Sequence, residues 1–135
     1  EVVSTCMDLA RESGGSVTLT SSVEEACTGA DVVYTDIWVS MGEPAELWEE
    51  RIKLLSPYQV NSRVIDLMAP TGIFMHCLPA FHDTETTIGA EIAERFGITE
   101  MEVTDEVFRG SRSRVFDEAE NRMHSIKAII YATLK

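Results

Sequence analysis

The sequence lacks any apolar run near the ~20 residues that a membrane helix needs, and basic residues are scarce. Eleven Lys and Arg stand against 23 Asp and Glu, which gives a formal net charge of −12. So acidic a chain repels nucleic acid and anionic membranes, and neither is expected as a partner. An anionic ligand would need a local positive site against this field.

Cysteine is also scarce, and residues 1–10 lack the features of a targeting segment. Cys6, Cys27 and Cys77 form no CxxC pair and cannot all pair with one another, which favours a reducing, cytoplasmic setting. The first ten residues carry Asp8 and no Lys or Arg, unlike a secretory signal or a transit peptide. They have no initiator Met and show helical spacing, so we expect an internal fragment of a longer polypeptide.

No linker, repeat or low-complexity tract interrupts the 135 residues, which suffice for one domain with a core. Strand-like segments alternate with helical patterns, which predicts an α/β fold with a doubly wound, Rossmann-like parallel sheet. In such sheets, ligands bind beyond the carboxyl ends of the strands. No GxGxxG follows a predicted strand, which argues against a dinucleotide-binding module.

The pattern predicts strands at 16–20, 31–36, 73–76 and 101–103. Helices are expected at 2–12, 22–27, 46–55, 61–68, 86–96 and 116–134. Ser22 and Glu25 form a capping box for the second helix, and Asn61 is a plausible N-cap for the fourth. Gly14 and Gly97 suit the C-terminal caps of two others.

Polar groups follow the predicted strand at 31–36. Asp36 ends the strand, and Ser40, Met41 and Gly42 follow in a turn. A carboxylate, a hydroxyl and freely oriented backbone amides can together hold the ammonium and carboxylate groups of an amino acid. The alternative is that Asp36 caps the following segment and the other residues form only a turn, where such residues are usual.

A thiol and an imidazole are adjacent at the next strand end, in His76-Cys77-Leu78-Pro79. The pair is typical of a nucleophile or a metal site. However, adjacent residues of an extended chain point to opposite sides, which places His76 poorly as a base for Cys77. A zinc site of Cys77, His76 and His82 has no credible fourth ligand, and free cysteine is often simply buried. An X–Pro bond before Pro79 can be cis and turn backbone carbonyls toward a ligand. The residues alone leave both interpretations of Cys77 open.

Arg122 lies near the start of the last predicted helix, in one row with Ile126 and Ile129. Its side chain should lean toward the helix N-terminus, where anions bind, and its guanidinium fork would suit an anion. The alternative is a surface ion pair with Glu118 at i−4 or with another nearby acid. Another group of arginines is expected only in a solvated loop: Arg109, Arg112 and Arg114.

Four motifs in order resemble the ornithine carbamoyltransferase family, with a likeness from about Val17 to Leu134. They are 36–42 (DIWVSMG), 74–82 (FMHCLPAFH), 102–108 (EVTDEVF) and 116–124 (FDEAENRMH). The Ser-Met-Gly turn and the Cys-bearing motif are specific in combination. Aspartate-using relatives lack the Cys-bearing version, and the Ser-Met-Gly turn argues against putrescine as the acceptor.

The resemblance implies where ornithine would bind. Asp36 and Ser40, with Met41, would hold the α-amino and α-carboxylate groups. Cys77 would lie near the δ-amine and orient it without forming a covalent intermediate, so Asp36 and Cys77 are the expected catalytic residues. His76 belongs to the motif but is not expected to be the base.

The resemblance also implies a carbamoyl phosphate site made by Cys77, Leu78 and Arg122. Leu78 would present its backbone carbonyl to the carbamoyl NH2 group, helped by a Leu78–Pro79 bond that is cis in the family. The δ-amine would attack the carbonyl carbon of carbamoyl phosphate and give citrulline and phosphate. No metal or organic cofactor is expected.

The sequence departs from the family in extent. It contains neither the carbamoyl-phosphate domain, with its Ser-x-Arg-Thr loop, nor the opening strand of the ornithine domain. We therefore expect a partial ornithine-binding α/β domain at 1–115, without its first strand, and a long C-terminal helix at 116–135 that packs on the absent domain. The parent enzyme is expected to be a homotrimer or higher oligomer, and the chain alone to be inactive. The alternative is a non-catalytic amino-acid-binding or regulatory module derived from the same fold.

Overall fold

Two short parallel strands form the centre of the fold in a computed structural model that describes residues 1–39, 43–44 and 46–134. β1 (Val32–Thr35) pairs with β2 (Ile73–His76), and Thr35 lies opposite His76 at the carboxyl end of the pair. The segment 112–114 lies along β2: the Phe74 N–H donates to the Arg112 carbonyl at 3.0 Å, and the Phe74 carbonyl accepts from the Arg114 N–H at 2.9 Å. The α/β class and the parallel pairing predicted from the sequence are confirmed.

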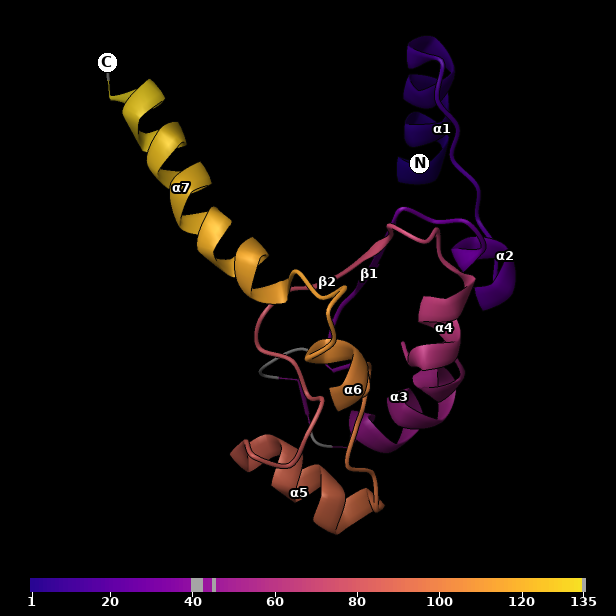
Figure 1. Cartoon of the computed structure of the whole chain (residues 1–135), viewed down its shortest axis with the longest axis vertical. Coiled ribbons are helices and arrows are strands. Elements are labelled where there is room, and N and C mark those ends of the chain that lie inside the picture. The colour runs from indigo at the N-terminus through magenta and orange to yellow at the C-terminus, as the bar shows by residue number, and fades with distance from the viewer. Residues whose placement is uncertain (40–42, 45, 135) are drawn as a thin grey trace.

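Helices surround this small sheet (Figure 1). In chain order they are α1 (Val2–Ser13), α2 (Val23–Cys27), α3 (Leu47–Leu55), the 3-10 helix η1 (Ser56–Tyr58), α4 (Ser62–Leu67), α5 (Thr87–Phe96), α6 (Asp105–Phe108) and α7 (Val115–Thr133). α2 packs on α4, and the beginning of α7 packs on β2. α5 lies at the end of the molecule opposite α1 and α7 (Figure 1).

The predicted helix caps account for several of these boundaries. The Ser22 hydroxyl accepts the Glu25 N–H, and the Asn61 side chain accepts the Val64 N–H. Gly14 and Gly97 end α1 and α5 in the left-handed conformation, with φ of 77° and 69°, which glycine adopts without a Cβ penalty. These elements follow from short-range hydrogen bonding, and they lie close to the predicted ranges.

The structure differs from the predictions at two strands and at one short helix. Residues 16–20 alternate as a strand would, yet they form no strand, and the prediction was wrong. Residues 101–103 contribute a single bridge, Val103 with Val60, in place of the predicted strand. The one-turn helix α6 was not predicted, because four residues are too few to show a helical period.

The buried apolar residues form two clusters. One lies between the sheet and the helices α4 and α6: Val60, Val64, Phe74, Ala80, Val103, Val107, Phe108 and Val115. The other lies between the end of β1, α3 and α5: Trp38, Val39, Ile52, Phe81, Ile92 and Met101. The loop that follows β2 contributes Ala80 to the first cluster and Phe81 to the second. Packing on both sides therefore fixes this loop.

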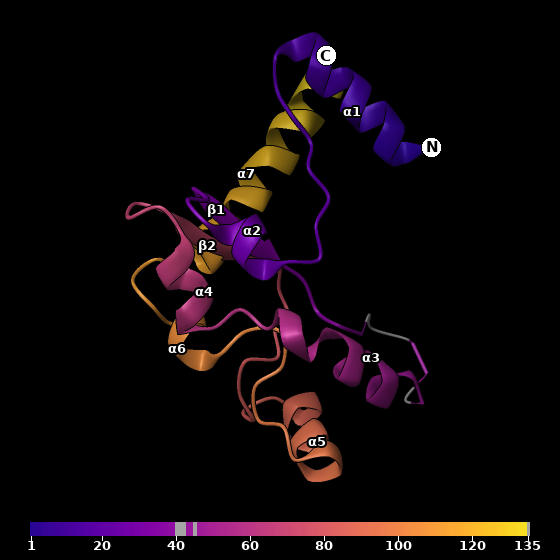
Figure 2. The same ribbon diagram turned by 90° about the vertical axis from the view of Figure 1, so that its right-hand side faces the viewer.

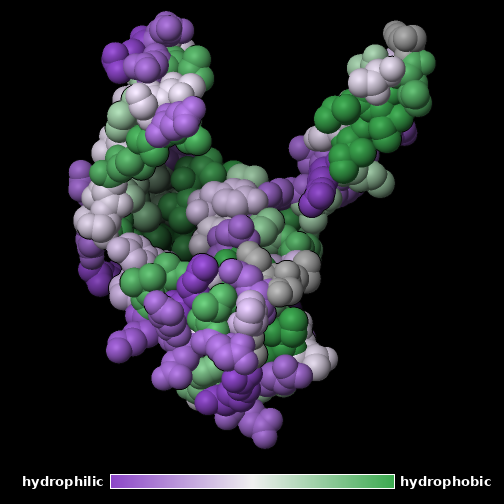
Figure 3. Space-filling model, turned by 180° about the vertical axis from the view of Figure 1, so that it is seen from behind, coloured by the Kyte–Doolittle hydropathy of each residue, from purple (hydrophilic) through white to green (hydrophobic). Residues whose placement is uncertain are grey.

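α1 and α7 extend from the body as two arms, which stand apart in Figure 1 and both lie at the end opposite α5 in Figure 2. Of α7 only Val115 is buried, and α1 has no buried residue. Seen from behind, hydrophobic side chains cover much of α7 and line the hollow between the arms (Figure 3). Among the described residues, no helix is long and apolar enough to cross a membrane.

Candidate functional site

The carboxyl ends of β1 and β2 bring Asp36 and Cys77 together. Each residue directly follows its strand, and parallel pairing places the two strand ends at the same edge of the sheet. The Cys77 thiol donates a hydrogen bond to Asp36 Oδ1 at 3.0 Å, and the Ile37 N–H donates to the same oxygen at 2.7 Å. Asp36 thus caps the segment that follows it, which was the alternative interpretation of its sequence position. It also binds the thiol of a residue 41 positions away.

The two groups shift each other's ionisation in opposite directions. Partial burial, together with the neighbouring Asp36 carboxylate, raises the pKa of Cys77 to about 11. The hydrogen bonds from Cys77 and from the Ile37 N–H lower the pKa of Asp36. At neutral pH the pair is therefore a neutral thiol and a carboxylate. A neutral thiol is a poor nucleophile, so this arrangement suits positioning better than covalent catalysis.

His76 is fully buried, and its ring nitrogens contact groups other than the Cys77 thiol. Its Nε2 lies 3.2 Å from Glu102 Oε1, and its Nδ1 contacts the Cys77 carbonyl. The same Glu102 oxygen accepts the Phe81 N–H at 2.6 Å, so one carboxylate holds both ends of the loop at 77–80. Both side chains have no exposed surface. Sequence reasoning gave Glu102 no role, although a carboxylate between Met101 and Val103 is a signal for a buried, paired acid.

Leu78 lies at the mouth of a pocket between this loop and the first turns of α7. The pocket has a volume of about 380 Å³ and is lined by His76, Cys77, Leu78, Glu118, Ala119, Asn121, Arg122 and Ser125. The Leu78–Pro79 peptide bond is cis, as expected. No described residue donates a hydrogen bond to the Leu78 carbonyl oxygen. The pocket therefore brings together Cys77, Leu78 and Arg122, the three residues assigned from the sequence to one ligand.

Arg122 has no ion pair within the part of the chain that the structure describes. Glu118, its expected partner at i−4, accepts instead a hydrogen bond from the Tyr34 hydroxyl at 2.9 Å. The ion-pair alternative for Arg122 was therefore wrong. Sequence reasoning missed Tyr34, although it precedes Asp36 by two positions, which places both side chains on one face of the strand.

Two of the residues assigned to ornithine, Ser40 and Met41, lie outside the described residues, and so does Gly42. Trp38 and Val39, which precede them, are buried in the second core cluster.

The metal-site alternative is not assembled around Cys77. Among the described residues, the side chains close enough to share a cation are His82, Asp83 and Asp105. Arg109 already occupies that cluster, with Nε 2.8 Å from Asp105 and Nη2 3.1 Å from Asp83. Its guanidinium neutralises the carboxylates that a cation would need. His82 also stacks on the Phe108 ring, with the ring centroids 3.6 Å apart.

The other two loop arginines, Arg112 and Arg114, donate hydrogen bonds to backbone carbonyls. Arg112 is half-buried and donates to the carbonyls of Ile65, Ala69 and Pro70, and so satisfies the C-terminal end of α4. The expectation of a solvated loop was wrong for this residue. Arg114 donates to the Ser111 and Ser113 carbonyls.

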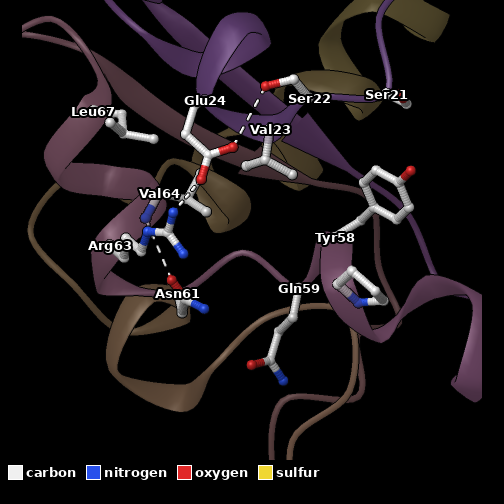
Figure 4. Close-up of a pocket in the computed structure, with 11 residues that line it drawn as sticks. Ser21, Ser22, Val23, Glu24, Tyr58, Gln59, Asn61, Arg63, Val64 and Leu67 are labelled. Atoms are coloured by element: carbon white, nitrogen blue, oxygen red, sulfur yellow. Dashed lines mark hydrogen bonds and ion pairs between the residues drawn. The ribbon is translucent and has the colours of Figure 1, made fainter.

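A second pocket lies between α2, η1 and α4 and contains no residue predicted to be functional (Figure 4). Its charged groups pair with each other, because Arg63 contacts Glu24 directly. The Gln59 amide turns away and donates to the Glu100 and Met101 carbonyls. The charged groups of this pocket are therefore paired with each other, whereas Arg122 has no ion pair among the described residues.

Comparison with known proteins identifies the family of the chain. A family model described as "Aspartate/ornithine carbamoyltransferase, Asp/Orn binding domain" matches residues 1–133. The catabolic ornithine carbamoyltransferase of Treponema denticola is 60% identical over 134 residues, and the ornithine carbamoyltransferase of Staphylococcus aureus is 54% identical over 135 residues. Each alignment covers 99% of this chain, which spans 40% of the length of either relative.

Solved structures give the same result. The ornithine carbamoyltransferase of Pyrococcus furiosus matches with a TM-score of 0.75 at 40% identity, over 96% of this chain and 36% of that one. The match extends over both arms and the sheet, because it covers nearly the whole sequence. The chain belongs to the aspartate/ornithine carbamoyltransferase family, and it carries that family's Asp/Orn-binding domain.

Proposed function

We propose that this chain forms the ornithine-binding wall of an ornithine carbamoyltransferase, which converts carbamoyl phosphate and L-ornithine to L-citrulline and phosphate. The observation that carries the proposal is the thiol–carboxylate pair of Cys77 and Asp36, beside a pocket lined by Arg122, which has no ion pair among the described residues. The pair suits an amine, and the free guanidinium suits a phosphate group. These are the two functional groups that such a reaction must bring together.

The amine must lose a proton before it can attack. An alkyl amine has a reference pKa of ~10.4, so it is mostly charged at neutral pH. The ionised Asp36 attracts the ammonium form and is placed to accept its proton, and the Cys77 thiol beside it orients the neutral nitrogen toward the pocket. Positioning and electrostatics of this kind account for large rate enhancements without a covalent intermediate.

The carbamoyl group would lie against the loop after β2. The Leu78 carbonyl, which accepts no hydrogen bond from the residues that the structure describes, accepts from the carbamoyl NH2 group, and Arg122 binds the phosphate oxygens with its fork. The δ-nitrogen forms a bond to the carbonyl carbon and gives a tetrahedral intermediate. The C–O bond to phosphate then breaks, phosphate leaves with the electron pair, and the proton lost by the nitrogen passes to the phosphate oxygens. Ser40 and Met41 remain assigned, by the resemblance, to the α-amino and α-carboxylate groups of ornithine.

The parent protein is part of the proposal, since this chain spans 40% of the curated relatives that it matches. Residues 1–115 form the ornithine-binding part, and the helix at 116–135 packs on the carbamoyl-phosphate domain. The assembly is a homotrimer or a higher oligomer in the cytoplasm. The exposed apolar face of α7 supports the packing role.

The test compares Asp36→Asn with Asp31→Asn in the full chain that carries this sequence. Both carboxylates are exposed and lie near β1, but only Asp36 contacts Cys77. We expect Asp36→Asn to lower kcat/KM for ornithine by roughly 10²-fold, the scale on which loss of a positioned proton-transfer group acts, and Asp31→Asn to change it little. Unchanged citrulline formation by the Asp36 variant contradicts the proposal. Ornithine binding without any citrulline formation by the unmodified full chain favours the non-catalytic alternative.

A further inference from the structure

Arg122 is unusual among the arginines of the described residues, because the others are engaged. Five of them form ion pairs with carboxylates: Arg11, Arg51, Arg63, Arg109 and Arg114. Arg112 binds backbone carbonyls, and Arg95 lies over the Phe96 ring. In a chain with a net charge of −12, a free guanidinium needs a structural reason.

The nearest competitor for Arg122 is Glu118, one helical turn earlier on α7. A glutamate four residues before a basic residue is the favourable order for an ion pair along a helix. Both side chains line the same pocket. Without another partner, Glu118 would therefore pair with Arg122 and compete with any anion that binds there.

Tyr34 supplies that other partner from β1, 84 positions away in the sequence. Its hydroxyl donates to Glu118 Oε1 at 2.9 Å, while Glu118 Oε2 is buried without a hydrogen-bond partner among the described residues. The hydrogen bond to Glu118 raises the pKa of Tyr34 to about 12, so the phenol keeps its proton at neutral pH and remains the donor.

We propose that Tyr34 is a positioning residue for the anion site: its phenol holds Glu118 away from Arg122 and leaves the guanidinium free for the phosphate group of the substrate. The inference rests on the proposed function in one respect, the assignment of Arg122 to that phosphate group. It adds a residue on β1 that controls the charge of the anion site through Glu118 on α7.

The test measures binding of inorganic phosphate by isothermal titration calorimetry, in the full chain that carries this sequence. Tyr34→Phe removes only the hydroxyl. The freed Glu118 then pairs with Arg122, and we expect the Kd for phosphate to rise about twofold, the factor that an exposed i, i+4 ion pair supplies. Tyr58→Phe is the matched control, because Tyr58 is a similarly exposed tyrosine in η1, away from this pocket.

A second substitution separates charge control from a structural role. Glu118→Gln removes the competing carboxylate, so Tyr34→Phe added to Glu118→Gln should leave the Kd for phosphate at the value of Glu118→Gln alone. If Tyr34 only anchored α7, loss of its hydroxyl would weaken that anchor in the double variant as well. The Kd for phosphate would then be higher in the double variant than in Glu118→Gln alone, and that result overturns the inference. An unchanged Kd in Tyr34→Phe overturns it as well.

Arg122→Gln distinguishes this inference from the proposed function. Weaker phosphate binding in Arg122→Gln, together with no effect of Tyr34→Phe, rejects the role of Tyr34 and keeps the assignment of Arg122. Unchanged phosphate binding in Arg122→Gln rejects that assignment, and the inference with it.

Discussion

At the scale of single residues, the site depends on groups whose chemical state is set by a neighbour on another element. Cys77 stays a thiol because of partial burial and because Asp36 lies 3.0 Å away. Glu102 holds the loop after β2 because His76 and the Phe81 N–H share one of its oxygens. Each of these pairs can be tested without an assay of the reaction.

The first residue-scale prediction concerns the reactivity of Cys77. Alkylation requires the thiolate, so a thiol with a pKa of about 11 should react at pH 8 on the order of 10²-fold more slowly than a model cysteine peptide with a pKa near ~8.5. The rate should continue to rise up to about pH 11. Asp36→Asn removes a negative neighbour, lowers the pKa of Cys77 and should increase the rate at pH 8. Peptide mapping by mass spectrometry after timed iodoacetamide treatment separates Cys77 from Cys6 and Cys27.

The second residue-scale prediction concerns Glu102. Glu102→Ala leaves His76 Nε2 and the Phe81 N–H buried without their acceptor, and each buried group that loses its partner costs about 1–3 kcal/mol. We expect the free energy of unfolding, measured in urea, to fall by that order or more. Glu94→Ala, at an exposed position in α5, is the control and should stay within about 0.5 kcal/mol of the unchanged chain. Equal effects of the two substitutions would contradict the role of Glu102.

At the scale of elements, the sequence predicted what short-range interactions determine. The caps at Ser22, Asn61 and Gly97 are local hydrogen bonds and turn geometries, and they were found as expected. Residues 16–20 failed as a strand because alternation is necessary but not sufficient: a strand needs a neighbouring strand, and no described segment pairs with them. Strand prediction therefore carries a long-range condition that helix prediction does not.

The contacts of the site also fall into those that the sequence could predict and those that depend on long-range packing. Asp36 and Cys77 could be placed together from the sequence, because both follow parallel strands whose carboxyl ends meet at one edge. The contacts of Glu102 with His76 and of Tyr34 with Glu118 join residues 26 and 84 positions apart through packing of a helix or a loop on the sheet. No local pattern encodes such contacts.

The element-scale prediction concerns the exposed apolar face of α7, which includes Met123, Ile126 and Ile130. Ile126 is 46% exposed, so Ile126→Asp should change the stability of the 135-residue chain by no more than about 0.5 kcal/mol. In the full chain, where we propose that this face packs on the carbamoyl-phosphate domain, the same substitution should lower the thermal unfolding midpoint. Lys127→Asp, on the adjacent position of the helix, is the control for charge. An unaffected midpoint in the full chain would remove the case for packing.

At the scale of the whole molecule, the 135 residues contain one wall of the proposed site. Asp36, Cys77, Leu78 and Arg122 lie along one edge, and the pocket beside them is open to solvent. Catalysis by positioning needs the reacting groups held from both sides and shielded from water.

The whole-molecule prediction is that the purified 135-residue chain forms no citrulline from ornithine and carbamoyl phosphate. The full chain that carries the sequence should form citrulline under the same conditions, in a colorimetric assay. Measurable turnover by the 135 residues alone would show that the single wall is sufficient, contrary to this proposal.

The two arms, α1 and α7, also affect how the 135-residue chain moves through solvent. They diverge from the body (Figure 1), so the chain meets more friction than a sphere of its 15.0 kDa mass. It should therefore sediment more slowly than a compact protein of equal mass, and the distribution of interatomic distances from small-angle scattering should show an extended tail. Docking of either arm on a larger body would remove its separate protrusion, so the tail would shrink relative to the overall dimensions of the particle, and scattering reports on the assembly independently of chemistry.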